Sequence, residues 1–157
     1  SIGNYAFSEC LSLTEITIPS FVTSIGSYAF RKCSKLALIS IPPSITSISR
    51  GLFTKCLSLE CVEISSSIIS IENFSFNGCS SLKEIKIPSS VININKCAFK
   101  NCTSLTHITI PTSVEYISEY AFYGCESLNQ VVIPSTFQTL NNFPFPSHTT
   151  IIQFFFN

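Results

Sequence analysis

The sequence predicts a β-rich solenoid, a fold in which short coils of chain stack along one axis. Phe recurs every 23 residues from Phe7 to Phe145, and Ile, Leu and Cys recur with the same period. A repeat of this length is typical of solenoids, because one coil buries its apolar face only against its neighbours. No insertion interrupts the period, and 45% of the residues are hydrophobic against 11% charged. We therefore expect one continuous core and a single domain over residues 1–157.

Each repeat is expected to contain two extended segments and one tight turn. Ile16-Thr17-Ile18 alternates apolar and polar residues, which predicts a short strand with one buried face. Pro19 should end that strand, because proline donates no ladder hydrogen bond. A second extended segment follows over residues 22–25, and the three-residue spacing of Phe30 and Cys33 favours a helical or 3₁₀ turn. Stacked coils then align identical residues in ladders.

Composition excludes several classes of function. Nine Lys and Arg balance nine acidic residues, all of them Glu, so no net field attracts nucleic acid or an anionic membrane. Arg31, Lys32 and Lys55 share one turn edge, but without interleaved aromatic residues they do not indicate nucleic-acid binding. No apolar run approaches the length of a membrane span, so we expect no membrane insertion. The chain begins within a repeat, and we expect it to be a piece of a longer protein.

Six of the eight cysteines follow the 23-residue period: Cys10, Cys33, Cys56, Cys79, Cys102 and Cys125. Each lies three residues after a ladder Phe, at a spacing that points into the core. Stacked cysteines come within disulfide range, but a bridge would break the equal spacing of the coils. Free Cys behaves as a small buried hydrophobe. We therefore expect buried free thiols, with no zinc because the chain contains no C-x-x-C pair.

The repeat can be written L-x-x-I-x-I-P-x-S-V-x-x-I-x-x-x-A-F-x-x-C, and residues 16–33 follow it almost throughout. This unit closely resembles the BspA-like leucine-rich repeat family. The resemblance implies a right-handed leucine-rich repeat solenoid of about seven coils. A parallel sheet would line its concave side, with short extended and helical turns on the convex side.

The same resemblance implies a non-enzymatic protein-interaction or adhesion module at the surface of a bacterium or a mucosal protozoan, with protein partners. It implies no cofactor, metal or catalytic residue. A second interpretation fits the same residues: a structural subunit of a cytoplasmic or cytoskeletal assembly, docking through its concave face and its ends.

The expected binding face consists of two columns of residues that point outward from the concave strands. The first column is Glu15, Leu38, Cys61, Glu84, His107 and Gln130, and the second is Thr17, Ser40, Glu63, Lys86, Thr109 and Val132. Leu38 and Val132 are candidate apolar anchors. Glu63 should face Lys86 one coil away, and Glu60 should face Lys83, each pair contributing about 0.2–1 kcal/mol.

Cys61, Glu84 and His107 are consecutive in the first column, which raises the question of a Cys-His hydrolase or a metal site. Two strand spacings separate Cys61 from His107, about 10 Å, which exceeds hydrogen-bond reach. A flat sheet also offers no oxyanion pocket. We therefore expect an ordinary solvated face at these residues.

The last repeat departs most from the pattern. By phase, His148 takes the Cys position, Ile151 the Leu position, and Phe154 and Phe156 the two strand positions. A final strand should pair with residues 131–133 and leave an uncapped edge, which is a template for another chain. We expect self-association or partner docking there, through Phe154, Phe155 and Phe156.

Overall fold

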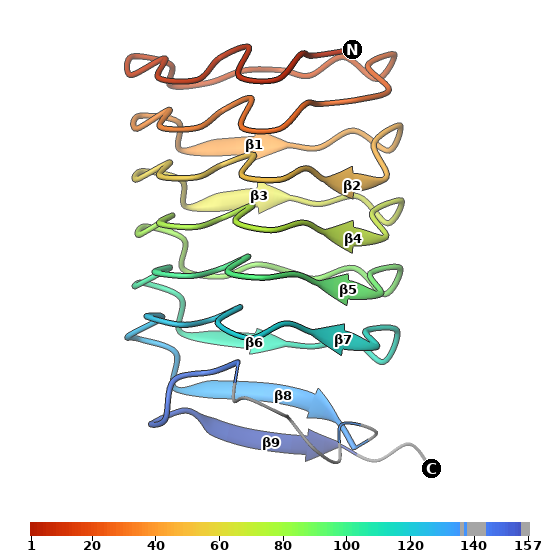
Figure 1. Cartoon of the computed structure of the whole chain (residues 1–157), viewed down its shortest axis with the longest axis vertical. Helices are drawn as coiled ribbons and strands as arrows, with labels where there is room; N and C mark the ends of the chain where they lie inside the picture. The colour runs from red at the N-terminus through yellow and green to blue at the C-terminus, as the bar shows by residue number, and fades with distance from the viewer. Residues whose placement is uncertain (136, 138–143, 155–157) are drawn as a thin grey trace.

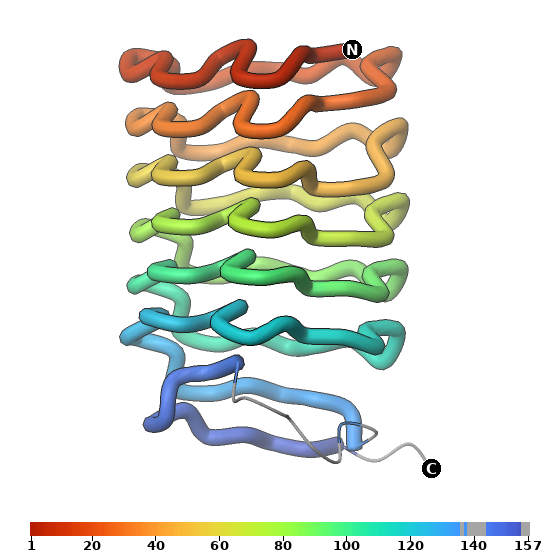
Figure 2. The backbone as a smooth tube through the Cα atoms, viewed as in Figure 1, coloured from red at the N-terminus to blue at the C-terminus, as the bar shows by residue number. Residues whose placement is uncertain are grey.

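A computed structural model describes residues 1–135, 137 and 144–154 of the chain. The coils stack one below another in a column, with the N-terminus at one end and residues 150–154 at the other (Figures 1 and 2). Every strand pair is parallel. The predicted β-solenoid is thereby confirmed.

One side of the column carries the longer strands, and we call it the long-strand face. Its strands are β1 (Leu38–Ser40), β3 (Cys61–Glu63), β6 (His107–Thr109), β8 (Gln130–Pro134) and β9 (Thr150–Phe154). They form two ladders, β1-β3 and β6-β8-β9. In β1, β3 and β6 the middle residue is buried and both flanking residues are exposed, as the alternation predicts.

The opposite side carries the second extended segment of each repeat, and we call it the short-strand face (Figure 1). Its strands are β2 (Ser47–Ile48), β4 (Ser70–Ile71), β5 (Asn93–Ile94) and β7 (Tyr116–Ile117). They form one four-stranded parallel ladder with a 23-residue register, Ile48 opposite Ile71. Their inward Ile side chains pack against those of the long-strand face, so the core lies between the two faces.

The Phe ladder occupies the centre of this core. Seven rings from Phe7 to Phe145 stack in sequence, with centroids 5.1–5.8 Å apart. The five inner rings are fully buried: Phe30, Phe53, Phe76, Phe99 and Phe122. Each inner ring therefore contacts an equivalent ring on both sides.

The predicted tight turn before each ladder Cys is present as a single turn closed by an i+3→i hydrogen bond, and it does not continue into a helix. The described residues contain no helix, and so none long and apolar enough to cross a membrane. The segment is instead a series of turns, in which Cys33 N–H donates to Phe30 O (3.1 Å) and Tyr28 N–H donates to Arg50 O in the next coil (2.9 Å). Tyr28 and Lys32 have left-handed backbone, with φ of 58° and 59°. Such residues reverse the local course of the chain, so a helix cannot continue through them.

A sequence signal for these turns exists but was missed. Gly51 takes the repeat position of Tyr28, and Gly78 and Gly124 take that of Lys32; all three have positive φ. Gly51 also lies under an aromatic ring, since a Cβ there would come 2.1 Å from Tyr28 Cε1. Glycine at recurring positions indicates left-handed backbone even where other copies carry a larger residue.

The last coil forms its predicted strand but in a different register. Val131 pairs with Ile151, which lies 20 residues later instead of 23. Phe145 keeps the period, because its ring stacks on Phe122 with centroids 5.1 Å apart. The three missing residues therefore fall between Phe145 and β9, where the chain takes a shorter path.

This slip corrects three assignments made by phase. His148 is exposed and does not occupy the Cys position, and Ile151 lies opposite Val131 instead of continuing the Leu ladder. Phe154 lies opposite Pro134, three residues beyond its expected place. Phe155 and Phe156 lie outside the described residues, so the predicted edge contact stays a prediction.

Candidate functional site

The two predicted columns lie on the outer surface of the long-strand face. Eleven of the twelve residues are exposed, and Val132 is half-buried. Strand register aligns them across coils: Leu38 opposite Cys61, Ser40 opposite Glu63, His107 opposite Gln130 and Thr109 opposite Val132. Leu38 is 64% exposed, which makes it the more accessible of the two candidate anchors. Their role in binding stays a prediction.

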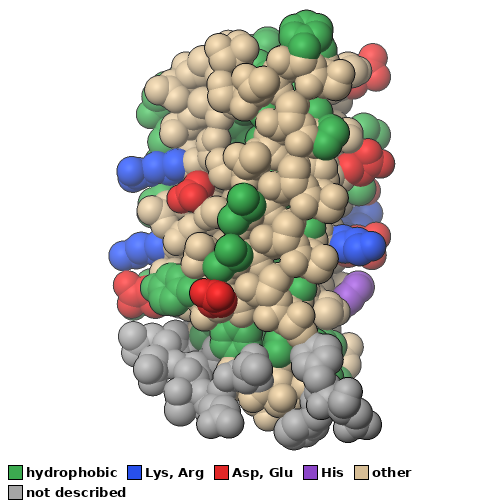
Figure 3. Space-filling model, turned by 90° about the vertical axis from the view of Figure 1, so that its right-hand side faces the viewer, with side chains coloured by type: hydrophobic (Ala, Val, Ile, Leu, Met, Phe, Trp, Pro, Cys, Tyr) green, Lys and Arg blue, Asp and Glu red, His purple; other side chains and the backbone are tan. Residues whose placement is uncertain are grey.

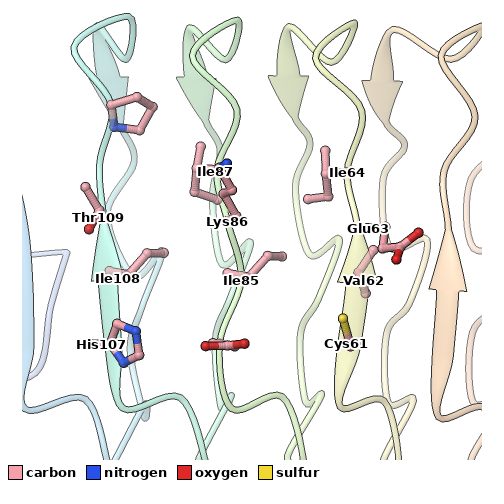
Figure 4. Close-up of a pocket in the computed structure, with 12 residues that line it drawn as sticks. Cys61, Val62, Glu63, Ile64, Ile85, Lys86, Ile87, His107, Ile108 and Thr109 are labelled. Atoms are coloured by element: carbon pink, nitrogen blue, oxygen red, sulfur yellow. The ribbon is translucent and has the colours of Figure 1, made fainter.

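A groove of about 710 Å³ lies over the middle of this face (Figure 4). Its rim carries the polar side chains of the columns, and its floor is apolar. The rim residues are Cys61, Glu63, Glu84, Lys86, His107 and Thr109, and the floor residues are Val62, Ile64, Ile85, Ile87, Ile108 and Pro111. Charged groups around an apolar floor are a combination that a macromolecular partner can use.

The groove coincides with an interruption of the sheet. The coil of residues 84–87 forms no strand, so the continuous sheet expected from the repeat divides into β1-β3 and β6-β8-β9. Among the described residues, the backbone N–H and C=O groups of 84–87 bond to no neighbouring coil. The nearest cross-coil bond runs from Thr106 N–H to Lys83 O, at 3.3 Å. Polar backbone groups without partners in the chain can bond to a ligand or to water.

Sequence reasoning missed the floor of this groove. Ile64, Ile87 and Pro111 occupy positions that the repeat assigns to structure. They nevertheless line the groove. No residue pattern in the sequence marks the interruption of the sheet.

The sequence predicts two ion pairs on this face, and the structure contains one of them. Lys83 Nζ lies 2.9 Å from Glu60 Oε2, which confirms that pair. The predicted Glu63–Lys86 pair is wrong, because within the described part of the chain Lys86 forms no ion pair. In Figure 4 the carboxylate of Glu63 points away from the side chain of Lys86.

Cys61, Glu84 and His107 all line the groove, without forming a catalytic pair. His107 Nδ1 lies 3.1 Å from Thr106 Oγ1, and in the described structure no hydrogen bond joins it to Cys61 or Glu84. No group of three His, Cys or acidic side chains among the described residues is arranged to hold a metal ion.

The cysteine ladder is confirmed as free thiols, and five of its six members are buried. Cys10, in the first coil, is exposed and corrects the prediction that all six are protected. Each buried thiol donates to the carbonyl of the Phe one coil earlier, as from Cys56 Sγ to Phe30 O (3.0 Å). Burial raises the pKa of the Cys33 thiol to about 11, which leaves it protonated at neutral pH. The buried ladder is therefore structural and unreactive.

The repeats of this chain match those of a known protein family. The family model for the BspA type leucine rich repeat region matches residues 1–102 and 73–157, with six copies. No curated protein matches the chain in sequence.

Several solved structures share the fold. A leucine-rich repeat protein of Treponema pallidum superposes with a TM-score of 0.80 at 26% identity, over 89% of this chain and 72% of that one. One from Eubacterium ventriosum gives a TM-score of 0.72 at 33% identity, over 78% of this chain and 33% of that one. The pneumococcal vaccine antigen PcpA gives 0.71 at 21% identity, over 90% and 36%, a likeness of fold alone. The chain spans about a third of the last two proteins.

Proposed function

The chain belongs to the BspA-type leucine-rich repeat family, and we propose that it is a non-enzymatic adhesion module that binds a protein with its long-strand face. Leucine-rich repeat proteins in general are protein-interaction modules. The observation that supports this particular surface is the groove over residues 84–87. It is the place where unpaired backbone groups, an apolar floor and a charged rim come together.

The groove suits a macromolecule better than a small substrate. Small-molecule sites are typically concave enough to enclose most of their ligand. Here the groove opens onto a flat face, and exposed side chains continue from it along both columns, from Glu15 to Gln130. A protein interface has the same anatomy, with an apolar centre and a polar rim. Solenoids commonly bind through such extended surfaces.

We place the module at the cell surface or outside the cell, because adhesion requires it and family membership supports it. The internal structural subunit remains the second candidate. One observation favours it: β9 is the last strand of its ladder among the described residues, and an edge strand can pair with another chain. Residues 154–156 would then form the contact.

Binding to immobilised fibronectin, fibrinogen, laminin and collagen tests the adhesion proposal. A face variant, Leu38→Asp with Glu84→Lys, should lose at least tenfold in affinity. A control variant, Ile69→Asp with Glu115→Lys, makes the same chemical changes at exposed residues outside the long-strand face and should bind like the unaltered chain.

Equal losses in the two variants would show that the long-strand face is not the binding surface. An unaltered chain that binds none of the four proteins would contradict matrix adhesion. Sedimentation then tests the second candidate. If the unaltered chain is an oligomer, and polar replacements at residues 154–156 dissociate it, the structural-subunit function is favoured.

A further inference from the structure

A group of basic side chains lies at one end of the second and third coils. Arg31, Lys32 and Lys35 belong to the turn before β1, and Lys55 belongs to the turn before β3. In Figure 1 these turns lie at the left-hand end of the strands. We call the four residues the basic turn cluster. Lys35 and Lys55 are exposed, and Arg31 and Lys32 are half-buried.

The backbone sets Glu9, Lys32 and Lys55 in one column. Glu9 N–H donates to Arg31 O in the next coil (2.7 Å), and Lys32 N–H donates in the same way to Thr54 O (2.7 Å). All three residues have left-handed backbone, with φ of 64°, 59° and 61°. Their side chains therefore leave the backbone in the same manner, one coil spacing apart, about 4.8 Å.

The carboxylate of Glu9 pairs with two of the four basic side chains. Arg31 Nη1 and Lys32 Nζ each lie 2.8 Å from the same oxygen, Glu9 Oε1. Their hydrogen bonds and charges, Lys32 first, hold the pKa of Glu9 below its usual value, so it stays ionised. The carboxylate of Glu9 therefore occupies a position where Arg31 and Lys32 together bind an anionic oxygen.

The cluster carries more positive charge than Glu9 balances. Among the described residues, Lys35 and Lys55 form no ion pair. Lys55 lies one coil from Lys32, and like charges that face each other across a ladder repel. An anionic ligand that reaches along the column would relieve this repulsion. It would also supply the counter-charge that one carboxylate cannot.

We propose that the basic turn cluster binds a linear anionic polysaccharide, sulfated or carboxylated, with Glu9 standing where one of its anionic groups would bind. Such a polymer carries negative groups at regular intervals, which suits cations repeated from coil to coil. Nucleic acid fits less well. The neighbouring aromatic ring, Tyr28, is already stacked on Tyr5 (centroids 5.2 Å apart) and covers Gly51, so it offers no free face for a base.

Retention on heparin–agarose in a NaCl gradient tests the proposal. The unaltered chain should be retained at about 0.15 M salt, where screening acts over roughly 8 Å. The variant K32Q/K55Q should elute at lower salt, with the salt dependence of binding reduced by about one per cation removed. The matched control K83Q/K96Q loses the same charge at coils outside the cluster and should elute with the unaltered chain.

A gain-of-binding variant tests the role assigned to Glu9. Glu9→Gln removes the internal anion and frees Arg31 and Lys32, so it should elute at higher salt than the unaltered chain. Circular dichroism melts of every variant verify that the fold is kept.

Three results would overturn the inference. If the unaltered chain does not bind heparin–agarose at about 0.15 M salt, the basic turn cluster is not a polysaccharide site. If K32Q/K55Q and K83Q/K96Q elute at equally lowered salt concentrations, retention depends on net charge alone and not on the basic turn cluster. If single-stranded DNA displaces the chain from heparin–agarose as effectively as soluble heparin does, the cluster does not select a polysaccharide and the proposed class of ligand is wrong. None of these results bears on the long-strand face, so failure here and failure of the adhesion proposal are distinguishable.

Discussion

Replacement of Phe76 by Ala is the sharpest test of how this fold is held together. Phe76 is fully buried in a central coil, and its ring stacks on Phe53 (5.4 Å between centroids) and on Phe99 (5.1 Å). The substitution removes a buried aromatic side chain, worth about 1.5–3 kcal/mol in apolar burial. It also removes two stacked contacts, each worth roughly 0.5–1.5 kcal/mol more. We expect a loss of about 3–5 kcal/mol in the free energy of unfolding.

The chain contains its own controls for this measurement. Phe7 is half-buried, and among the described residues its ring stacks on that of Phe30 alone, so Phe7→Ala should cost about half as much as Phe76→Ala. Glu63 is exposed, and Glu63→Ala should cost under about 1 kcal/mol.

Urea unfolding followed by circular dichroism, with linear extrapolation to water, gives the three values. If Phe7→Ala costs as much as Phe76→Ala, the second stacked neighbour contributes nothing and the ladder argument fails. If Glu63→Ala costs as much, inside and outside have been assigned wrongly.

Two further predictions concern the thiols and the turns. Titration of the native protein with a thiol reagent should find two fast-reacting cysteines, Cys10 and Cys61, and six that react only after denaturant is added without reductant; a requirement for reductant would reveal disulfides. Gly51→Ala should destabilise the protein by at least about 1 kcal/mol, because the residue has positive φ and its new Cβ would meet the Tyr28 ring. Gly3→Ala, where the new Cβ meets nothing within 4 Å, should be nearly neutral, and thermal melts of the two variants decide between these outcomes.

The arrangement of inside and outside could be predicted from the sequence because a solenoid makes its contacts between neighbouring repeats. Once the period is known, residues 23 apart must stack. The stacked Phe rings, the buried Cys33 thiol and the exposed flanks of β1 all follow from that single number and from strand alternation. The columns of the candidate face were located for the same reason.

The details of the candidate sites could not be predicted in this way. Nothing in the repeat distinguishes residues 84–87 from equivalent coils, yet the ladder is interrupted there and the Glu63–Lys86 pair does not form. The shared carboxylate of Glu9 was missed as well. Its contact with Arg31 and Lys32 depends on side-chain conformation around left-handed backbone, and the sequence gives no rotamer.

The sequence by itself determined the period, the two faces and the ladders, because the apolar pattern specifies which side chains must leave water and the repeat specifies what they meet. Only the tertiary structure decided the sign of φ at Tyr28 and Lys32 and the register of the last coil, in which Val131 meets Ile151. A left-handed residue other than glycine costs free energy locally, and hydrogen bonds to the next coil offset that cost. The register of a terminal coil is likewise set by contacts with the coil beside it, so both features depend on neighbours that are near in space and distant in sequence.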